Sequence, residues 1–287
     1  ILGVPWRVLA MSADLAREPE LADRIVAAEP GLAKDMPGQY GPYCYALGNV
    51  HAARGEHASA FAAYARGAAL MRAALRYDRD GDRNDAAQAV DGYTAERIAA
   101  IAETQREPTG RTIFVTGLPR SGTTLVQQII TAHSAVSDGA ETNRLTLLAR
   151  EVGGPSCSTL ARYVEANGAA AAAHLWHHWL DELFPGAGCV VDKTVTTSRF
   201  LGLAATLLPE APLVWLTRDP LDRAWSCFRT NFLGGAMPWS YDLQDIAFHF
   251  RLEDELLAQW RQLLGEQLLV VPYEGLVEDP AMWIRRI

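Results

Sequence analysis

The hydrophobic positions of the chain follow one pattern before residue 107 and another after it. Residues 1–105 contain no strand-like run and place Ala, Leu, Arg and Glu at helical spacing, which predicts an all-helical region. After Pro108 and Gly110, which interrupt regular structure, short apolar runs alternate with helical patterns. This alternation is typical of a parallel sheet flanked by helices. We therefore predict a helical region over 1–107 and an α/β domain over 108–287.

The apolar runs and the helical periodicity also predict the individual elements of the α/β domain. Strands are expected at 111–116, 134–138, 189–193, 213–217 and 268–272. Helices are expected at 122–133, 160–183, 199–208, from 220 onward and at 243–264. One further helix is expected over 84–104, just before the boundary between the two regions.

One segment of the helical region has a more specific pattern. The stretch YCYALGNVHAARGEHASAFAAYARGAAL places small and large residues at offsets that resemble a tetratricopeptide (TPR) helix-turn-helix unit: Leu47, Gly48, Gly55, Ala60, Tyr64 and Gly67. The small residues allow the paired helices to approach closely. An unrelated Ala-rich helical hairpin is the alternative, because only one repeat is clear and arrays generally need about three.

Composition and charge exclude several classes of protein. The chain has 287 residues and a formal net charge of −8, which argues against non-specific nucleic-acid binding. The four cysteines form no CxxC pair, so neither a zinc site nor a disulfide framework is expected, and no other metal site is predicted. No apolar run is long enough for a membrane span, and the first residues lack the basic start of a signal peptide. We expect a cytoplasmic protein with both chain ends trimmed.

A glycine-bearing loop follows the first predicted strand. The sequence GLPRSGTT joins this strand to a helix, and the free N–H groups at a helix N-terminus can hold a phosphate. Gly117, Gly122 and Thr124 fit the Walker A pattern, but Thr123 occupies the position of its lysine. Kinases and nucleotide triphosphatases use that lysine beside magnesium to neutralise the terminal phosphates. The loop is therefore better suited to a less charged phosphate ligand.

The motif PRSGTTL after a strand resembles the 5′-phosphosulfate loop of sulfotransferases that use 3′-phosphoadenosine 5′-phosphosulfate (PAPS). The resemblance runs from about Thr112 to Pro280. It implies a P-loop-type parallel sheet, PAPS as the sulfuryl donor and no metal ion. It also implies that the donor is held by Arg120, Ser121, Gly122, Thr123 and Thr124.

A second segment, LVWLTRDPLDRAWSCF, resembles the 3′-phosphate site of the same family. Arg218 at the end of a strand offers a two-pronged guanidinium contact, and Ser226 in the next helix adds a hydroxyl. The alternative is that Arg218 pairs with Asp219 or Asp222 at the helix start, with Ser226 as a small packing residue.

The segment SDGAETNRL provides the candidate general base. Its counterpart in protein-tyrosine and TPR-linked sulfotransferases carries a glutamate near the reacting hydroxyl, and the matching residue is Glu141. Helix capping is the alternative role for Glu141. His133 is a rival base, but its place at the end of a predicted helix favours a capping or packing role.

Lys193 is one of only two lysines in the chain, the other being Lys34. It follows a predicted strand, and ligands of parallel sheets bind beyond the carboxyl ends of the strands. The family resemblance assigns to Lys193, together with Arg120, the stabilisation of charge on the transferring group. A salt bridge from Lys193 to Asp192 or to a neighbouring helix is the alternative.

Taken together, the segments predict transfer of a sulfuryl group from PAPS to an acceptor hydroxyl on a peptide tyrosine, a saccharide or a small molecule. The order of the two regions resembles the bacterial TPR-linked sulfotransferases, in which the helical region could contact a peptide or protein. The family's C-terminal glycine-rich stretch has no counterpart before Ile287, which puts cofactor affinity in doubt. A P-loop nucleotide kinase and a TPR adaptor with an inactive sulfotransferase-like domain are the alternatives.

Overall fold

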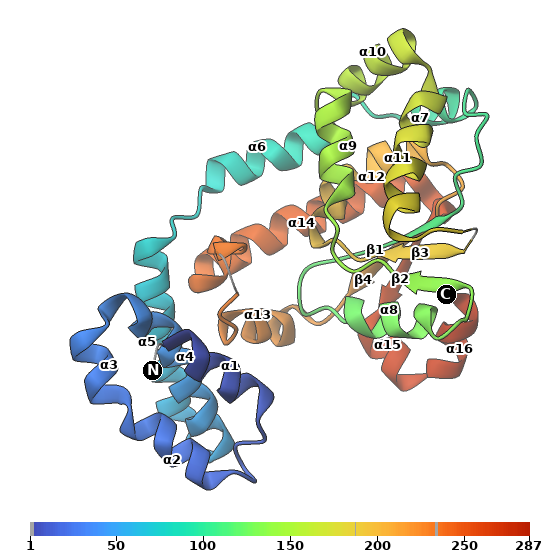
Figure 1. The fold of residues 1–287 in the computed structure, drawn as a ribbon. Helices are drawn as coiled ribbons and strands as arrows, with labels where there is room; N and C mark the ends of the chain where they lie inside the picture. The colour runs from blue at the N-terminus through green and yellow to red at the C-terminus, as the bar shows by residue number, and fades with distance from the viewer. Residues whose placement is uncertain (1–2, 187, 233–234) are drawn as a thin grey trace. The chain divides into compact units, whose positions relative to one another are not determined.

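The fold was analysed in a computed structural model that describes residues 3–186, 188–232 and 235–287. Its contacts divide the chain into two compact units (Figure 1). The first unit comprises Ile1–Arg79 and Ala224–His249, and the second comprises Asp80–Arg223 and Phe250–Ile287. The predicted boundary after residue 107 divides the chain at a single point. The division by contacts instead assigns two separate stretches of the chain to each unit. The boundary stays a prediction.

The described residues of the first unit form helices joined by turns and loops, without a strand. Its N-terminal segment consists of α1 (Gly3–Ser12), α2 (Pro19–Ala27), α3 (Glu29–Asp35), α4 (Pro37–Ala53) and α5 (His57–Ala74). Their core contains Trp6, Ile25, Tyr43, Leu47 and Val50. The last part of α13 (Pro220–Phe228), the 3₁₀ helix η3 (Pro238–Tyr241) and the start of α14 (Leu243–Leu264) complete the unit.

Helices α4 and α5 form a closely packed hairpin at the predicted TPR-like segment. A Cβ at Gly48 would lie 2.3 Å from the Tyr64 ring, and a Cβ at Gly67 would lie 2.9 Å from the ring of Tyr45. The pairing of small with large residues that the sequence predicted is therefore present in this hairpin. Its membership in a TPR array remains a prediction.

The second unit is built on a five-stranded sheet. Its strands are β1 (Thr112–Thr116), β2 (Val136–Asp138), β3 (Cys189–Asp192), β4 (Leu213–Thr217) and β5 (Leu268–Pro272). They lie in the order β2-β3-β1-β4-β5, and every pairing is parallel. The predicted strands and the parallel α/β class are thus confirmed. All five carboxyl ends lie at one edge of the sheet.

Helices cover both faces of this sheet (Figure 1). On one face Phe114, Val190 and Trp215 pack against α7 (Ala95–Ala102), α9 (Arg144–Val152), α10 (Cys157–Asn167), α11 (Ala169–Leu183), α12 (Leu201–Leu207) and α14. On the other face Val115, Val191 and Val214 pack against α8 (Thr123–Thr131), α15 (Tyr273–Glu278) and α16 (Pro280–Arg286). Because adjacent strand residues face opposite sides, strands covered on both faces are apolar almost throughout.

Two predicted helices are each divided into two in the structure. The helix expected over 160–183 is two helices, α10 and α11, separated by Gly168 at a φ of +78°. The helix expected over 84–104 is also divided, into α6 (Arg79–Val90) and α7, with Gly92 at a φ of +72° between them. Glycine adopts these left-handed angles without a Cβ clash, which ends each helix.

Helix α9 was not predicted from the sequence. Its buried residues Leu145, Leu148, Ala149 and Val152 recur at spacings of three, four and seven, so helical periodicity was a signal for it. The predicted 199–208 helix begins earlier, as the 3₁₀ helix η1 (Val195–Phe200), and continues as α12. Among the described helices, none is long and apolar enough to cross a membrane.

Candidate functional site

The loop between β1 and α8 has a backbone that requires glycine at two positions. Gly117 has a φ of +140°, and a Cβ there would lie 2.6 Å from the carbonyl oxygen of Leu216. Gly122 has a φ of +100° at the N-cap of α8, and a Cβ there would lie 2.6 Å from the Tyr273 ring. Arg120 is also left-handed, at +68°. The loop therefore turns tightly against β4 and against the residue that follows β5.

Ser121 occupies the interior of this loop. Its side chain is fully buried, and its Oγ has no hydrogen-bond partner among the described residues. A buried hydroxyl without a partner costs about 1–3 kcal/mol. The first N–H groups of α8, which begins at Thr123, likewise have no acceptor within the helix. A bound anion would satisfy both kinds of donor, as expected of a phosphate-binding loop.

Glu141 and Lys193 come from neighbouring strands and meet beyond their carboxyl ends. Glu141 lies three residues after β2, Lys193 directly follows β3, and the two strands pair in parallel. The Lys193 Nζ donates to Glu141 Oε1 at 2.5 Å. The lysine side chain is 12% exposed and the glutamate side chain 52%, so the carboxylate faces solvent while the ammonium is sheltered. The structure thus brings the predicted base and the predicted lysine together.

A buried carboxylate, Asp192, joins the two segments that carry this pair. Its Oδ2 accepts from Thr142 Oγ1 at 3.0 Å, and its Oδ1 accepts from the Thr194 N–H at 2.9 Å. The Thr194 Oγ1 accepts in turn from the Asn143 N–H at 3.1 Å. The sequence suggested Asp192 only as a possible partner for Lys193. In the structure, Asp192 instead accepts hydrogen bonds from the residues next to Glu141 and next to Lys193. Asp192 therefore holds the two segments in register.

Arg218 lies at the end of β4, beside the glycine loop. Its Nη1 donates to the carbonyl oxygen of Arg120 at 3.1 Å, and its Nη2 lies 3.5 Å from Asp222 Oδ2. The Nε is buried and has no acceptor among the described residues. The pairing with Asp222 matches the structural alternative considered from the sequence, but it leaves this N–H donor unsatisfied.

Tyr273 lies at this site and was not among the site residues predicted from the sequence. Its ring centroid lies 4.6 Å from the Arg218 guanidinium carbon, which is the geometry of a cation–π contact. The same ring limits the space at Gly122. Tyr273 directly follows β5. The rule that pointed to Lys193, that side chains beyond strand ends face the ligand, was therefore an available signal for Tyr273.

The other site residues predicted from the sequence lie in the glycine loop, on α8 or just after it, and on α13. Thr123 is buried and Thr124 exposed in the first turn of α8, and Arg120 is exposed in the loop. Ser226 is buried on α13, within the part of that helix assigned to the first unit, so its proposed role with Arg218 stays a prediction. His133 Nδ1 accepts from the Ala135 N–H at 3.2 Å, a turn contact just after α8.

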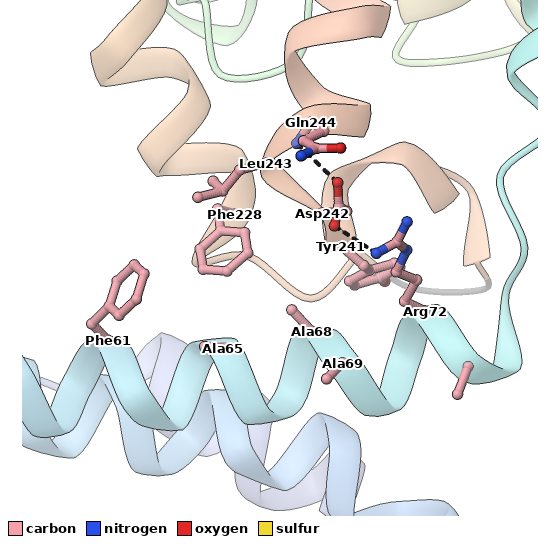
Figure 2. A pocket seen from close by; sticks show the side chains of 11 residues that line it. Phe61, Ala65, Ala68, Ala69, Arg72, Phe228, Tyr241, Asp242, Leu243 and Gln244 are labelled. Carbon is pink, nitrogen blue, oxygen red and sulfur yellow. Dashed lines mark hydrogen bonds and ion pairs between the residues drawn. The ribbon is translucent and has the colours of Figure 1, made fainter.

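The described residues also bear on metal binding and on grooves away from the glycine loop. Within the described residues, no group of three or more His, Cys, Asp or Glu side chains is arranged to hold a metal ion. The first unit contains a groove of about 680 Å³ along the alanine-rich face of α5. Figure 2 shows Phe61 and Phe228 facing each other across it, with the Arg72–Asp242 ion pair at 2.7 Å. The residues of the glycine loop, Glu141 and Lys193 do not line this groove.

Comparison with known proteins assigns a family to the part of the chain that begins at residue 112. Residues 112–287 match the model of the sulfotransferase family. An uncharacterised protein of Aquifex aeolicus strain VF5 is 26% identical in an alignment of 254 residues that covers 85% of this chain and 33% of the relative. The chain thus spans a third of that relative's length.

Two solved structures also match. A sulfotransferase from Alicyclobacillus acidocaldarius has 16% identity and a TM-score of 0.40, with coverage of 63% of this chain and 79% of the other. Sulfotransferase STF9 from Mycobacterium avium has 18% identity and a TM-score of 0.41, with coverage of 71% and 69%.

Proposed function

The chain belongs to the sulfotransferase family, and we propose that it transfers a sulfuryl group from PAPS to an acceptor hydroxyl. The observation that carries the choice of donor is the buried, unpartnered Ser121 hydroxyl inside the glycine loop. PAPS would supply the activated sulfuryl group and a 5′-phosphate of lower charge than a nucleoside triphosphate. Such a ligand fits a loop in which Thr123 stands in place of the Walker A lysine.

The residues of the loop would bind the donor without a metal ion. The backbone amides of Arg120 to Thr124, with the hydroxyls of Ser121, Thr123 and Thr124, would hold the 5′-phosphosulfate. The unpaired Nε–H of Arg218 suits the 3′-phosphate, to which Ser226 would add its hydroxyl. Arg120 and Lys193 would stabilise negative charge on the transferring group and on the departing phosphate oxygen.

Glu141 would act as general base. Its salt bridge with Lys193 joins an ammonium to a carboxylate, and the carboxylate is the form that a base requires. As the bond between sulfur and the phosphate oxygen breaks, a bond between sulfur and the acceptor oxygen forms, and the acceptor proton passes to Glu141. Catalysis then depends mainly on positioning and on charge stabilisation.

We further propose that the chain is one of the TPR-linked sulfotransferases, which are related to the protein-tyrosine sulfotransferases. The proposal is supported by the close packing of Gly48 on Tyr64 and of Gly67 on Tyr45 in the α4–α5 hairpin. It implies that the first unit contacts a peptide or protein. The longer relative from Aquifex aeolicus offers a test, because a TPR array in it would contain further helical hairpins of the same length.

Calorimetry with 3′-phosphoadenosine 5′-phosphate, the product of the donor, tests the proposal directly. We expect binding to the wild type and weaker binding of adenosine 5′-phosphate, which lacks the 3′-phosphate. Arg218→Ala should lower affinity for the bisphosphate about 10- to 100-fold, because charge-assisted hydrogen bonds are lost, and should barely change affinity for the monophosphate. Arg261→Ala, an exposed arginine on α14, is the matched control.

The alternatives make different predictions in the same experiments. A nucleotide kinase would bind ATP with magnesium and transfer its terminal phosphate. An adaptor with an inactive domain would bind neither the bisphosphate nor PAPS. Either result would overturn the proposed function.

A further inference from the structure

The turn that follows β4 is tied to the residues that follow β5. The two strands are parallel neighbours, and the last pair of their register is Thr217 beside Pro272. Two positions beyond each of these residues, Oε1 of Glu274 accepts a hydrogen bond from the Asp219 N–H at 2.9 Å. Ligands of parallel sheets bind beyond the carboxyl ends of the strands, so this contact lies at the ligand-binding edge of the sheet.

Asp219 directly precedes α13 and caps its start. Its Oδ1 accepts from the N–H groups of Leu221 and Asp222 at 2.9 and 3.0 Å. A side-chain oxygen that accepts from the first N–H groups of a helix fixes the point at which the chain enters the helix. Asp219 is therefore held on both sides, because Glu274 accepts from its N–H while its carboxylate binds the first turn of α13.

The same turn fixes the guanidinium of Arg218. Its Nη2 lies 3.5 Å from the carboxylate of Asp222, whose N–H is one of the two that Asp219 holds. Its Nη1 donates to the carbonyl oxygen of Arg120 in the glycine loop at 3.1 Å. The buried Nε–H has no acceptor among the described residues. The direction in which Arg218 presents this N–H therefore depends on the turn that Glu274 holds.

We propose that Glu274 is a positioning residue for donor specificity: through the Asp219 turn, it holds Arg218 in the orientation that selects a ligand with a 3′-phosphate. The inference rests on the proposed function, in which Arg218 contacts the 3′-phosphate of PAPS. Glu274 acts through Asp219 and not by contact with the ligand, because a carboxylate repels a phosphate.

A purely structural role for Glu274 is the alternative. The residue lies in the first turn of α15, where the positive end of the helix dipole favours a carboxylate. Loss of that interaction would destabilise the end of β5 and would weaken every adenosine ligand by the same factor. Loss of the positioning role would weaken only a ligand that carries a 3′-phosphate. The two roles therefore differ in the ratio of two affinities.

Calorimetry with 3′-phosphoadenosine 5′-phosphate and with adenosine 5′-phosphate measures this ratio for Glu274→Ala and Glu274→Gln. Both variants lack the charge, so a difference between them isolates the hydrogen bond to Asp219, which the glutamine oxygen can still accept. We expect Glu274→Ala to bind the bisphosphate about 3- to 10-fold more weakly than Glu274→Gln, the effect of one hydrogen bond. The two variants should bind the monophosphate within a factor of two of each other, which also shows that both are folded.

The corresponding pair on the same helix, Glu278→Ala and Glu278→Gln, is the matched control and should show no difference for either ligand. Equal bisphosphate affinities for the two Glu274 variants would overturn the positioning role, as would an equal loss for both ligands in Glu274→Ala. A wild type that binds neither ligand, or binds both equally, would instead be a failure of the proposed function.

The Arg218→Ala background tests whether Glu274 acts through Arg218. Residues that act as one unit have non-additive effects, so the difference between Glu274→Ala and Glu274→Gln should fall below twofold once Arg218 is absent. A difference of the original size in this background would show that Glu274 acts on another group and would overturn the inference.

Discussion

The Nζ of Lys193 lies 2.5 Å from Oε1 of Glu141, although 52 positions separate the two residues in the chain. The contact exists because β2 and β3 are parallel neighbours, so the segments after them meet at one edge of the sheet. It couples the proposed base to the proposed stabiliser of the transferring group. Changes at either residue should therefore affect catalysis more than stability.

Replacement of Glu141 by Gln keeps the size of the side chain and removes its ability to accept a proton. We expect kcat to fall by about 10²- to 10⁴-fold, the usual contribution of general acid–base catalysis, with affinity for 3′-phosphoadenosine 5′-phosphate within a factor of two of the wild type. Steady-state kinetics and calorimetry measure the two quantities. Glu151→Gln, on an exposed position of α9, is the control. Full turnover by Glu141→Gln would remove the base assignment.

Replacement of Lys193 by Met removes the charge and keeps most of the side chain's length. Both kcat and bisphosphate affinity should fall by at least tenfold, because the ammonium would stabilise charge on the transferring group and the leaving phosphate. The melting temperature should shift by less than about 2 °C, since ion pairs with a solvent-exposed partner contribute only about 0–1 kcal/mol. Lys34→Met, the same change at the chain's other lysine, should leave both measurements unaltered.

Replacement of Ser121 by Ala should change stability and binding in opposite directions. The ligand-free protein should gain about 1 kcal/mol in its free energy of unfolding, because a buried hydroxyl without a partner is removed. Bisphosphate affinity should fall at least threefold, because a donor to the ligand is lost. Urea denaturation and calorimetry measure these effects, and Ser134→Ala at an exposed loop position is the control. A loss of stability would show that the hydroxyl has a structural partner.

Replacement of Asp192 by Ala should loosen the link between the base segment and the lysine segment. The Thr142 hydroxyl and the Thr194 N–H lose their acceptor, and the cost is about 1–3 kcal/mol in the free energy of unfolding. Burial lowers the pKa of the neighbouring Arg144 guanidinium, and the charge of the Asp192 carboxylate acts in the opposite direction. We expect a fall in kcat with bisphosphate affinity unchanged.

Asp192→Asn keeps an oxygen for the Thr194 N–H and should recover part of the stability and part of kcat. A merely structural role for Asp192 would leave kcat of the folded variants at the wild-type level, which would contradict its positioning role.

The His177 imidazole makes the stability depend on pH. Burial lowers its pKa below the ordinary value of 6.5, and the Arg111 guanidinium adds to this effect. The unfolded chain therefore takes up a proton at a higher pH than the folded chain, and stability is lost as pH falls below about 6.5. The wild-type melting temperature should fall more steeply between pH 7 and 5.5 than that of His177→Leu. His57→Leu, at the exposed start of α5, should keep the wild-type slope.

The sequence alone determined the elements that depend on local pattern. Apolar runs predicted β1, β3, β4 and β5, because strands covered on both faces must be apolar along most of their length. The glycine loop was readable for a similar reason, since only glycine tolerates the angles at Gly117 and Gly122. The breaks at Gly92 and Gly168 were missed because a lone glycine inside a helical pattern does not show whether the helix continues.

Only the tertiary structure decided which side chains meet. The sequence named Glu141 and Lys193 separately, and their contact follows from the strand order β2-β3-β1-β4-β5, which no local pattern encodes. The same holds for Asp192, for the Tyr273 ring under Arg218 and for the Glu274 contact with Asp219. Strand pairing and side-chain burial depend on residues far apart in the chain. Periodicity and motifs report only on neighbours, so they locate the parts of the site but not the contacts between them.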